Sequence, residues 1–399
     1  MDSPDPAARI AALADECVKC GLCLPHCPTY ALDATETESP RGRIALAAAG
    51  ISGAVEPGHD LRRHLDHCLA CLACERVCPV PVHYGPLIVE TRAALAPAKR
   101  RPRLLLDILS RPRLLRVLAA LSRIAGAHLW LPLLTRPLPK DSALRAAARV
   151  LAVAPPVGSA VRGGAPAAGS HTRVALFGGC VQGVYERDAH AAAVRLLQAA
   201  GFEVLMIGNL CCGALAAHTG DAPHADKLMR HVREAFERSG AHILLTGTSG
   251  CLGTLRAALP NTQVDEVLGF LAAHAEALQF NARDAQVALH LPCTQVNVAR
   301  NGDAIRQLLA RVPGLRVSVL PTQAQCCGAA GSHMLEFPQR AAAYREKVLA
   351  LLPQPAPDAL LTSNVGCRLH FAVGLKENGS GLAVEHPLTL LAGQLRDGT

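Results

Sequence analysis

Short apolar runs alternate with longer amphipathic patterns through the C-terminal half of the chain. Short apolar runs are typical of strands buried in a parallel sheet, and patterns with a period of about 3.6 residues predict helices between them. The order strand, helix, strand, helix, strand occurs twice, which predicts two α/β (βαβαβ) units with parallel sheets and right-handed crossovers. The predicted strands are 174–178, 203–207, 242–246, 286–290, 315–320 and 358–362, and the predicted helices are 188–200, 222–238, 301–311 and 338–352.

The N-terminal part has a different pattern and is predicted to be mostly helical, so the whole chain is α+β. We expect helices over 5–16 and 85–96, and a further helix entered at the apolar stretch 44–49. Residues 104–121 predict amphipathic helices that are interrupted at Pro112, because proline lacks the amide that a helix interior needs.

The segment that follows the N-terminal part is basic and has two open interpretations. Such a segment can lie on an anionic membrane or dock a partner. It can also be a helical connector packed between two domains, which is the interpretation that we favour. The apolar stretch 124–134 is too short to span a bilayer, and residues 152–170 are predicted to be a flexible linker. The basic residues are Lys99, Arg100, Arg101, Arg103, Arg111, Arg113, Arg116 and Arg123.

Composition narrows the class of protein. The 399 residues are 50% hydrophobic and include 16 cysteines, with a net charge of +8 and 3% aromatic residues. A modest charge with few aromatic residues argues against nucleic acid as a partner. Residues 1–16 show no export signal, so we expect a cytoplasmic protein with reduced thiols, attached peripherally to the membrane if the basic segment binds lipid. The expected domains are 1–98, 99–170, 171–282 and 283–399.

Two cysteine runs near the N-terminus carry the clearest chemistry. Both read C-x2-C-x2-C-x3-C-P, the spacing of two-cluster ferredoxins, in which the fourth cysteine reaches the other cluster. Zinc sites and disulfides explain the repeated triplet less well, because zinc ligands usually come as two separated pairs. The expected cofactors are therefore two [4Fe–4S] clusters. Cluster one is assigned to Cys17, Cys20, Cys23 and Cys78, and cluster two to Cys68, Cys71, Cys74 and Cys27.

Charged residues lie beside both runs. Arg41 and Arg43 either offset the negative charge of the thiolate-bound clusters or are simply solvated. His64 and His67 precede the second run. They could donate hydrogen bonds near a cluster or carry protons coupled to electron transfer, but a surface position is the interpretation that we favour for both.

The C-terminal half is an internal repeat in which all eight cysteines match. The offsets between matching cysteines are 113, 115 and 116 residues, which indicates a duplicated unit. Each cysteine group follows a predicted strand, where parallel sheets bind ligands. One or two further iron–sulfur clusters are the favoured interpretation, with a vicinal disulfide or a zinc site as alternatives. The candidate ligands are Cys180, Cys211, Cys212 and Cys251 in the first unit, and Cys293, Cys326, Cys327 and Cys367 in the second.

With these motifs the chain resembles the iron–sulfur subunit of glycolate oxidase. The matching stretches are Leu65-Asp66-His67-Cys68-Leu69-Ala70-Cys71, His290-Leu291-Pro292-Cys293-Thr294, Cys326-Cys327-Gly328-Ala329-Ala330-Gly331-Ser332 and Asn364-Val365-Gly366-Cys367. The resemblance implies that a separate FAD-containing subunit oxidises glycolate to glyoxylate. This chain would then have no catalytic residue of its own and would relay electrons to a quinone or other membrane acceptor.

Related subunits serve anaerobic glycerol-3-phosphate dehydrogenase, lactate oxidation and heterodisulfide reductase, so these remain alternatives. In heterodisulfide reductase each CCG repeat ends in CxxC. Here Thr254 and His370 stand at the last cysteine positions, which disfavours a disulfide-cleaving enzyme. No flavin or nucleotide fingerprint is recognised, since Gly178-Gly179 lacks the required spacing.

Overall fold

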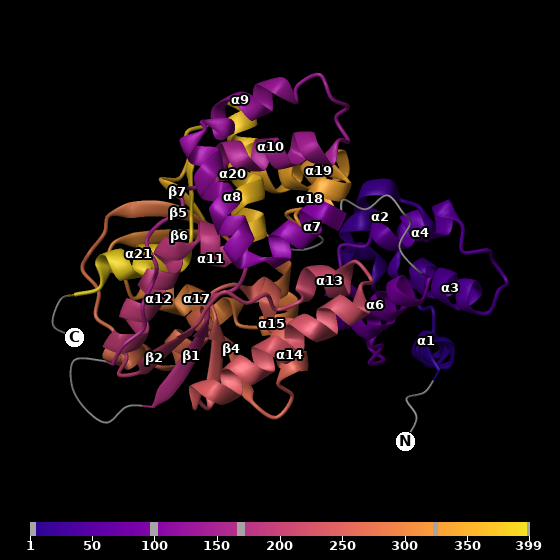
Figure 1. Cartoon of the computed structure of the whole chain (residues 1–399), viewed down its shortest axis with the longest axis horizontal. Helices are drawn as coiled ribbons and strands as arrows, with labels where there is room; N and C mark the ends of the chain where they lie inside the picture. The colour runs from indigo at the N-terminus through magenta and orange to yellow at the C-terminus, as the bar shows by residue number, and fades with distance from the viewer. Residues whose placement is uncertain (1–4, 96–102, 166–171, 322–325, 397–399) are drawn as a thin grey trace.

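A computed structural model describes residues 5–95, 103–165, 172–321 and 326–396 (Figure 1). A helical N-terminal part lies at one side of the molecule, and the two parallel sheets lie at the other, with helices of the basic segment above them. The predicted α+β class, with a mostly helical N-terminal part and two parallel α/β units, is confirmed.

Two of the N-terminal helices begin at positions that a side chain caps. Asp5 accepts a hydrogen bond from the Ala7 amide, and Ser39 accepts one from the Gly42 amide, so each side chain satisfies a free donor at a helix start. The helices pack around a small apolar core that includes Ile10. They are α1 (Pro6–Asp15), α2 (Pro28–Asp33), α3 (Pro40–Ile51), α4 (His59–Asp66), α5 (Ala73–Arg76) and α6 (Tyr84–Ala94).

Four helices of the basic segment connect the N-terminal part to the sheets. They are α7 (Arg103–Ser110), α8 (Pro112–Ile124), α9 (Ala127–Leu134) and α10 (Ala143–Val153). The predicted break at Pro112 is confirmed, because α7 ends at Ser110 and Pro112 is the first residue of α8. Residues 99–101 and 166–170, which belong to the predicted basic segment and linker, lie outside the described residues.

The helices of this segment are short. Within the described residues, no single helix has the length and apolar character to cross a membrane. Only α8 and α9 taken together reach that length, and they meet at an 88° bend.

The first α/β unit contains a four-stranded parallel sheet in the order β2-β1-β3-β4. The strands are β1 (Arg173–Phe177), β2 (Glu203–Ile207), β3 (Ile243–Thr246) and β4 (Gln263–Glu266). The helices are α11 (Gln182–Tyr185), α12 (Arg187–Ala199), α13 (Ala214–His218), α14 (Ala222–Ser239), α15 (Leu252–Ala258) and α16 (Val267–Ala273).

The second unit repeats this arrangement in the order β6-β5-β7-β8. The strands are β5 (Ala285–His290), β6 (Leu315–Val319), β7 (Ala359–Thr362) and β8 (Ala383–Glu385). The helices are α17 (Gly302–Ala310), α18 (His333–Glu336), α19 (Pro338–Leu349), α20 (Val365–Glu377) and α21 (Pro387–Gln394), with a π-helical turn at Gln295–Ala299.

The structure adds a fourth strand to each predicted unit. β4 and β8 are short and partly polar, so their sequences give no strand pattern. They are parallel edge strands, paired to β3 and β7 respectively. The expectation of three strands per unit was therefore incomplete.

The two units share one apolar core. Helix α21 of the second unit packs against α12 of the first, and α16 of the first packs against α17 of the second. Buried side chains from both units, among them Leu197, Leu271, Leu309 and Leu391, form a continuous cluster. Since the two contacts involve matching helices, the duplicated units are held in a fixed relation, with the cysteine loops of each close to their interface.

Candidate metal centres

The two N-terminal cysteine runs fold into matching loops. The second residue after the first cysteine has a left-handed backbone in both runs, at Lys19 and Ala70, and so does the fourth, at Gly21 and Leu72. Left-handed residues turn the chain sharply, so each loop curves around its three cysteines. The equal spacing of the two sequences thus gives equal backbone shapes.

One small cavity is lined by cysteines from both runs. Cys27 of the first run faces Cys68, Cys71 and Cys74 of the second. Burial and neighbouring thiols raise the pKa of Cys74, so these sulfurs would need a metal to remain deprotonated together. Four convergent thiols in a buried pocket fit an iron–sulfur cluster. They are also the four residues assigned to cluster two from the spacing, and that assignment stays a prediction.

Two hydroxyls accompany these sulfurs. Thr29 Oγ1 lies 3.1 Å from Cys27 Sγ, and the Tyr84 hydroxyl lies 3.4 Å from Cys68 Sγ. The Thr29 hydroxyl donates its proton to the Glu38 carbonyl at 2.7 Å, which leaves the Tyr84 hydroxyl as the donor of the two. Hydrogen bonds to cluster sulfurs are among the features that tune the redox potential of an iron–sulfur cluster.

The first triplet is more exposed. Burial raises the pKa of Cys23 to about 11, with smaller contributions from Cys27, Cys17 and Cys20. Cys17 and Cys78 both pack against the N-terminal core. Next to them, the His83 amide donates a hydrogen bond of 2.7 Å to the Glu16 carboxylate, which ties the segment after Cys78 to the start of the first run. This tie is compatible with Cys78 completing cluster one, which also stays a prediction.

The two arginines beside the runs have different environments. Arg41 is partly exposed and pairs with Glu36 at 2.7 Å. Arg43 is only 1% exposed, pairs with Glu38, and donates to the His64 carbonyl at 2.7 Å. Burial lowers the pKa of Arg43, but Cys68, Tyr84, Glu38 and Cys27 together raise it. Arg43 is therefore a buried cation beside the cluster-two pocket, and Arg41 is not.

The two histidines converge on the same carboxylate. His64 Nδ1 and His67 Nδ1 lie 2.7 and 2.8 Å from Glu38 Oε1. Burial raises the pKa of Glu38, but His67, Arg43 and His64 lower it to about 2. The expected surface position is wrong for His67, which is 8% exposed. The reason is the buried carboxylate, which offers an acceptor to each ring.

The first α/β unit brings its four cysteines together. Cys180, Cys211, Cys212 and Cys251 follow β1, β2 and β3 at the carboxyl edge of the sheet. The sulfurs of Cys212 and Cys251 are 3.0 Å apart. Hydrogen bonds with Cys211 and Cys251 hold the pKa of Cys212 well below its ordinary value, while the pKa of Cys211 is raised. Such a set stabilises one thiolate within a group of thiols, as a metal site requires.

The second unit repeats the arrangement with Cys293, Cys326, Cys327 and Cys367. The sulfurs of Cys327 and Cys367 are 2.6 Å apart, and those of Cys293 and Cys326 are 4.0 Å apart. Here hydrogen bonds with Cys293 and Cys327 hold the pKa of Cys326 well below its ordinary value. All sixteen cysteines are free thiols, so the structure gives no support to the vicinal disulfide.

The non-cysteine residues at the repeat ends have ordinary structural roles. Thr254 Oγ1 donates to the Cys251 carbonyl at 2.9 Å. His370 is buried, and its Nε2 donates to the Ala341 carbonyl at 3.1 Å. Burial first, and then Arg345, lower the pKa of His370 to about 4. Each unit therefore offers four sulfur ligands rather than five.

The cluster-two pocket adjoins the cysteines of the second unit. Cys71, Cys293 and Cys326 pack around one small apolar cluster that contains Leu69 and Tyr344. Burial raises the pKa of Cys71 well above its ordinary value, and the next largest cause is Cys326. This proximity could not be read from the sequence, since 255 residues separate the two cysteines.

Two residues that sequence reasoning missed hold this junction. Asn297 Nδ2 donates to the Cys71 carbonyl at 2.7 Å, and its Oδ1 accepts from Arg76 at 2.8 Å. Arg92 is 6% exposed and donates to the carbonyls of Cys68 and His218 at 2.7 and 2.8 Å. Neither belongs to a cysteine motif, so only the tertiary contacts reveal them.

Comparison with known families agrees with this geometry. A family profile described as a 4Fe-4S dicluster domain matches residues 13–82. A second profile, described as a cysteine-rich domain, matches residues 174–256 and 287–372. The chain therefore belongs to the class of iron–sulfur proteins in which a 4Fe-4S dicluster domain precedes two cysteine-rich domains.

Within this class the chain is similar to glycolate oxidase subunits. It is 29% identical to the probable glycolate oxidase iron–sulfur subunit of Bacillus subtilis (strain 168), over 91% of this chain and 89% of that protein. It is 28% identical to the glycolate oxidase iron–sulfur subunit of Escherichia coli (strain K12), over 89% of both. Lactate utilization protein A of Bacillus licheniformis is 24% identical over 54% of this chain and 96% of that protein. The family resemblance inferred from the motifs is confirmed.

Proposed function

We propose that this protein is the iron–sulfur electron-transfer subunit of a complex that oxidises a 2-hydroxy acid, with glycolate as the substrate of its partner. The observation that carries the proposal is the packing of Cys71 against Cys293 and Cys326. It brings the second of the N-terminal cysteine sites beside the cysteines of the second unit. The likeness to glycolate oxidase subunits over most of both chains supports glycolate over lactate.

Eight N-terminal cysteines would hold two [4Fe–4S] clusters, with Cys17, Cys20, Cys23 and Cys78 on one and Cys68, Cys71, Cys74 and Cys27 on the other. The cysteines of the two α/β units would hold one or two more. When bound, such clusters accept and release single electrons. The domain division at residues 98, 170 and 282 belongs to the same proposal.

The chain itself positions and insulates these sites. Arg43 places a buried positive charge beside Cys27 and Cys68, which favours added negative charge in the pocket. Asn297 and Arg92 fix the backbone of the second run against the α/β units. A fixed separation between neighbouring sites is what an electron relay needs from its protein.

The oxidation of an alcohol needs a hydride acceptor, and clusters alone do not provide one. We therefore infer a FAD-containing partner that oxidises glycolate and passes electrons singly to this chain. The acceptor at the far end would be a quinone or another membrane acceptor, reached by a cytoplasmic protein attached peripherally to the inner face of the membrane. Nucleic acid is not a partner in this proposal.

Iron content and electron relay test the proposal together. Anaerobically purified protein should carry at least about eight irons per chain, from two clusters of four. The isolated chain should not oxidise glycolate. Combined with its flavoprotein, it should deliver electrons to a quinone analogue, and Cys71→Ser should block this delivery while glycolate still reduces the flavin.

The same experiments must distinguish the electron relay from the alternative function, a disulfide reductase. Zinc as the main metal would refute the cluster assignment. Robust disulfide reduction by the isolated chain, abolished by Cys327→Ser, would replace the relay by a reductase.

A further inference from the structure

Exposed apolar side chains gather on helices α8 and α9. Among the described residues, 16 large hydrophobic side chains are exposed, and ten of these lie between residues 114 and 144. We call six of them, at the bend between the two helices, the apolar elbow. The elbow consists of Leu121, Ile124, Leu129, Trp130, Leu133 and Leu134, whose exposed fractions range from 44% to 85%. A contiguous apolar surface of this kind usually marks an interaction site.

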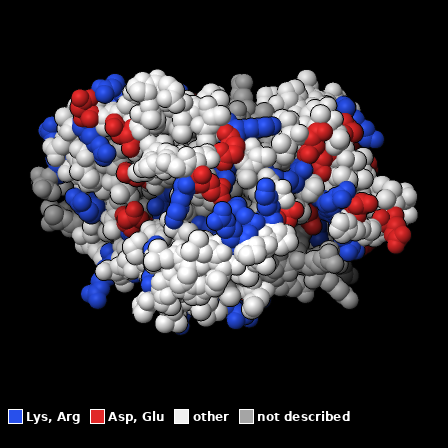
Figure 2. Space-filling model, turned by 90° about the horizontal axis from the view of Figure 1, so that it is seen from above, with Lys and Arg blue, Asp and Glu red and all other residues white. Residues whose placement is uncertain are grey.

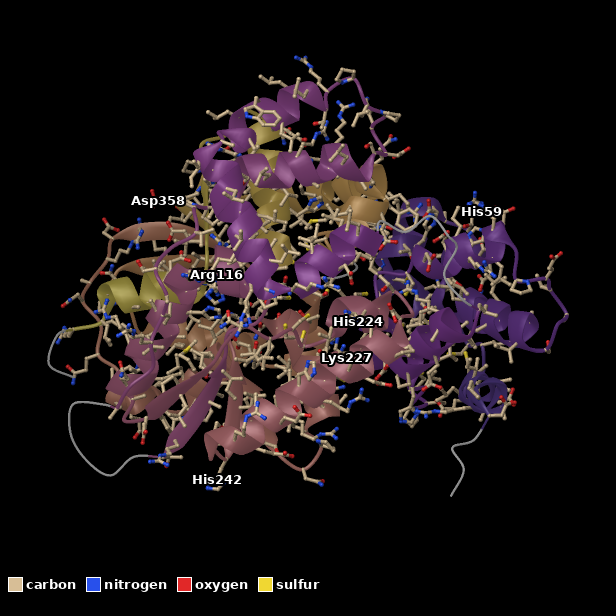
Figure 3. The ribbon with its side chains drawn as sticks, viewed as in Figure 1. His59, Arg116, His224, Lys227, His242 and Asp358 are labelled. Carbon is tan, nitrogen blue, oxygen red and sulfur yellow. The ribbon has the colours of Figure 1, made fainter. Side chains whose placement is uncertain are left out.

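The elbow is additional to the face that holds α8 in the fold. Leu115 and Ala119 are buried and pack against Val184 of the first unit. Arg116, which Figure 3 shows between α8 and this unit, donates to Asn209 Oδ1 at 3.0 Å. The helix is thus anchored through one side, and its other apolar side is left to solvent.

The charge of the same segment identifies what could cover the elbow. Residues 108–140 contain six Lys and Arg residues and no Asp or Glu. Arg113, Arg136 and Lys140 are exposed. Helix α9 lies at the top of Figure 1, and the view from above in Figure 2 shows broad white areas with blue and red side chains between them.

An anionic bilayer surface matches this combination. Apolar side chains can enter the acyl region while cations at the edge meet lipid phosphates, and tryptophan prefers that interface. A second copy of the chain fits less well, because a two-fold contact would bring the same cations together. The elbow lies where the two helices meet at an 88° bend, so an interfacial contact requires neither helix to cross the membrane.

We propose that the apolar elbow docks this protein on an anionic bilayer, with Ile124, Trp130 and Leu133 below the headgroups and Arg136 and Lys140 at the phosphates. The use of this contact rests on the proposed electron-relay function. A cavity of about 270 Å³ at the N-terminal end of α8 is lined by Arg113 and reaches Cys211. The elbow lies at the other end of this 13-residue helix, so docking would fix the cysteine site about 20 Å along α8 from the membrane.

The chain carries its own probe, since Trp130 is its only tryptophan. Vesicles of phosphatidylglycerol and phosphatidylcholine should shift the Trp130 emission to the blue, and lipids brominated on the acyl chains should quench it. Vesicles of phosphatidylcholine alone should bind weakly. Added salt should weaken binding to the anionic vesicles, because the phosphate contacts are screened.

Variants test whether vesicle binding depends on the apolar elbow. The double change Ile124→Glu and Leu133→Glu should abolish vesicle sedimentation, whereas Val55→Glu, at an exposed apolar residue in the N-terminal part, should not. Arg136→Gln or Lys140→Gln should weaken binding about fivefold each, the change that corresponds to ~1 kcal/mol per cation at a membrane surface.

Several results would overturn the proposal. One is a Trp130 emission that anionic vesicles do not shift. Another is vesicle binding that Val55→Glu weakens as much as the double change Ile124→Glu and Leu133→Glu does. A third is a dimer of the unmodified chain that this double change dissociates and Val55→Glu does not. Electron relay to a soluble acceptor, measured in parallel, separates the two proposals. If the relay fails but vesicle binding persists, the proposed function is wrong and the docking surface stands.

Discussion

Arg43 offers the sharpest test of how the N-terminal part is stabilised. Its guanidinium donates to the His64 carbonyl, to Thr29 Oγ1 at 2.8 Å and to the Glu38 carbonyl at 2.7 Å, and it pairs with the Glu38 carboxylate. Replacing Arg43 by Met keeps a long apolar side chain and removes all of these donors. The Glu38 carboxylate, 3% exposed, then loses its nearest cation.

Removing one partner of a buried ion pair costs about 3–5 kcal/mol, because the other charge stays buried. The two histidines still contact Glu38 Oε1, and Arg340 Nη2 lies 3.6 Å from Oε2. These groups offset part of the loss, so we expect the lower end of the range, ~3 kcal/mol. That corresponds to about a 100-fold increase in the opening equilibrium of α3 and α4.

Hydrogen exchange of the iron-loaded protein, under anaerobic conditions, measures this directly. Arg41→Met is the matched control, since Arg41 lies two residues away in the same loop but pairs at the surface. The control should leave exchange in α3 and α4 unchanged. If Arg43→Met also leaves it within about 1 kcal/mol of the unmodified protein, or if both variants behave alike, the reasoning from burial is refuted.

Three further predictions concern the α/β units and their junction. Burial lowers the pKa of His386 to about 3 from an ordinary 6.5. Between these two pH values His386 is therefore protonated in the unfolded chain and neutral in the folded chain. Stability should therefore fall as the pH drops from about 6.5 to 3, and His386→Asn should flatten this loss by about 1.4 kcal/mol per pH unit in urea titrations; equal slopes would contradict it. Asn297→Leu should lower the free energy of local opening of the loop around Cys71 by ~1 kcal/mol, which would appear as faster amide exchange in that loop but not in α21. Unchanged exchange would show that Asn297 does not hold the junction. Phe371→Ala, at a side chain that is 0% exposed, should cost about 3–5 kcal/mol in the free energy of unfolding, and a loss under 1 kcal/mol would mean that the site collapses around the smaller residue.

The sequence determined the regular elements and the chemistry of the cysteines. Strands such as 203–207 and helices such as 222–238 could be predicted because their apolar period is local and long enough to be unambiguous. The spacing of each cysteine run, together with its left-handed turn residues, is also a local property. The duplication of Cys-Cys-Gly could be recognised by matching positions alone.

The tertiary structure decided which distant segments meet. β4 and β8 are strands only because they pair with β3 and β7, since their own sequences are too short and polar to specify one. His67 is buried because Glu38 accepts from it inside the N-terminal part.

The tertiary structure also decided how the N-terminal part meets the second unit and which side of the basic segment is buried. Cys71 meets Cys326 only because the N-terminal part docks on the second unit, a contact between residues that no local pattern links. The basic segment could be predicted to be amphipathic, but its sequence shows apolar residues on both sides of α8. Only the packing of Leu115 against Val184 decides which side is core and which side, at Ile124 and Leu121, is left to solvent.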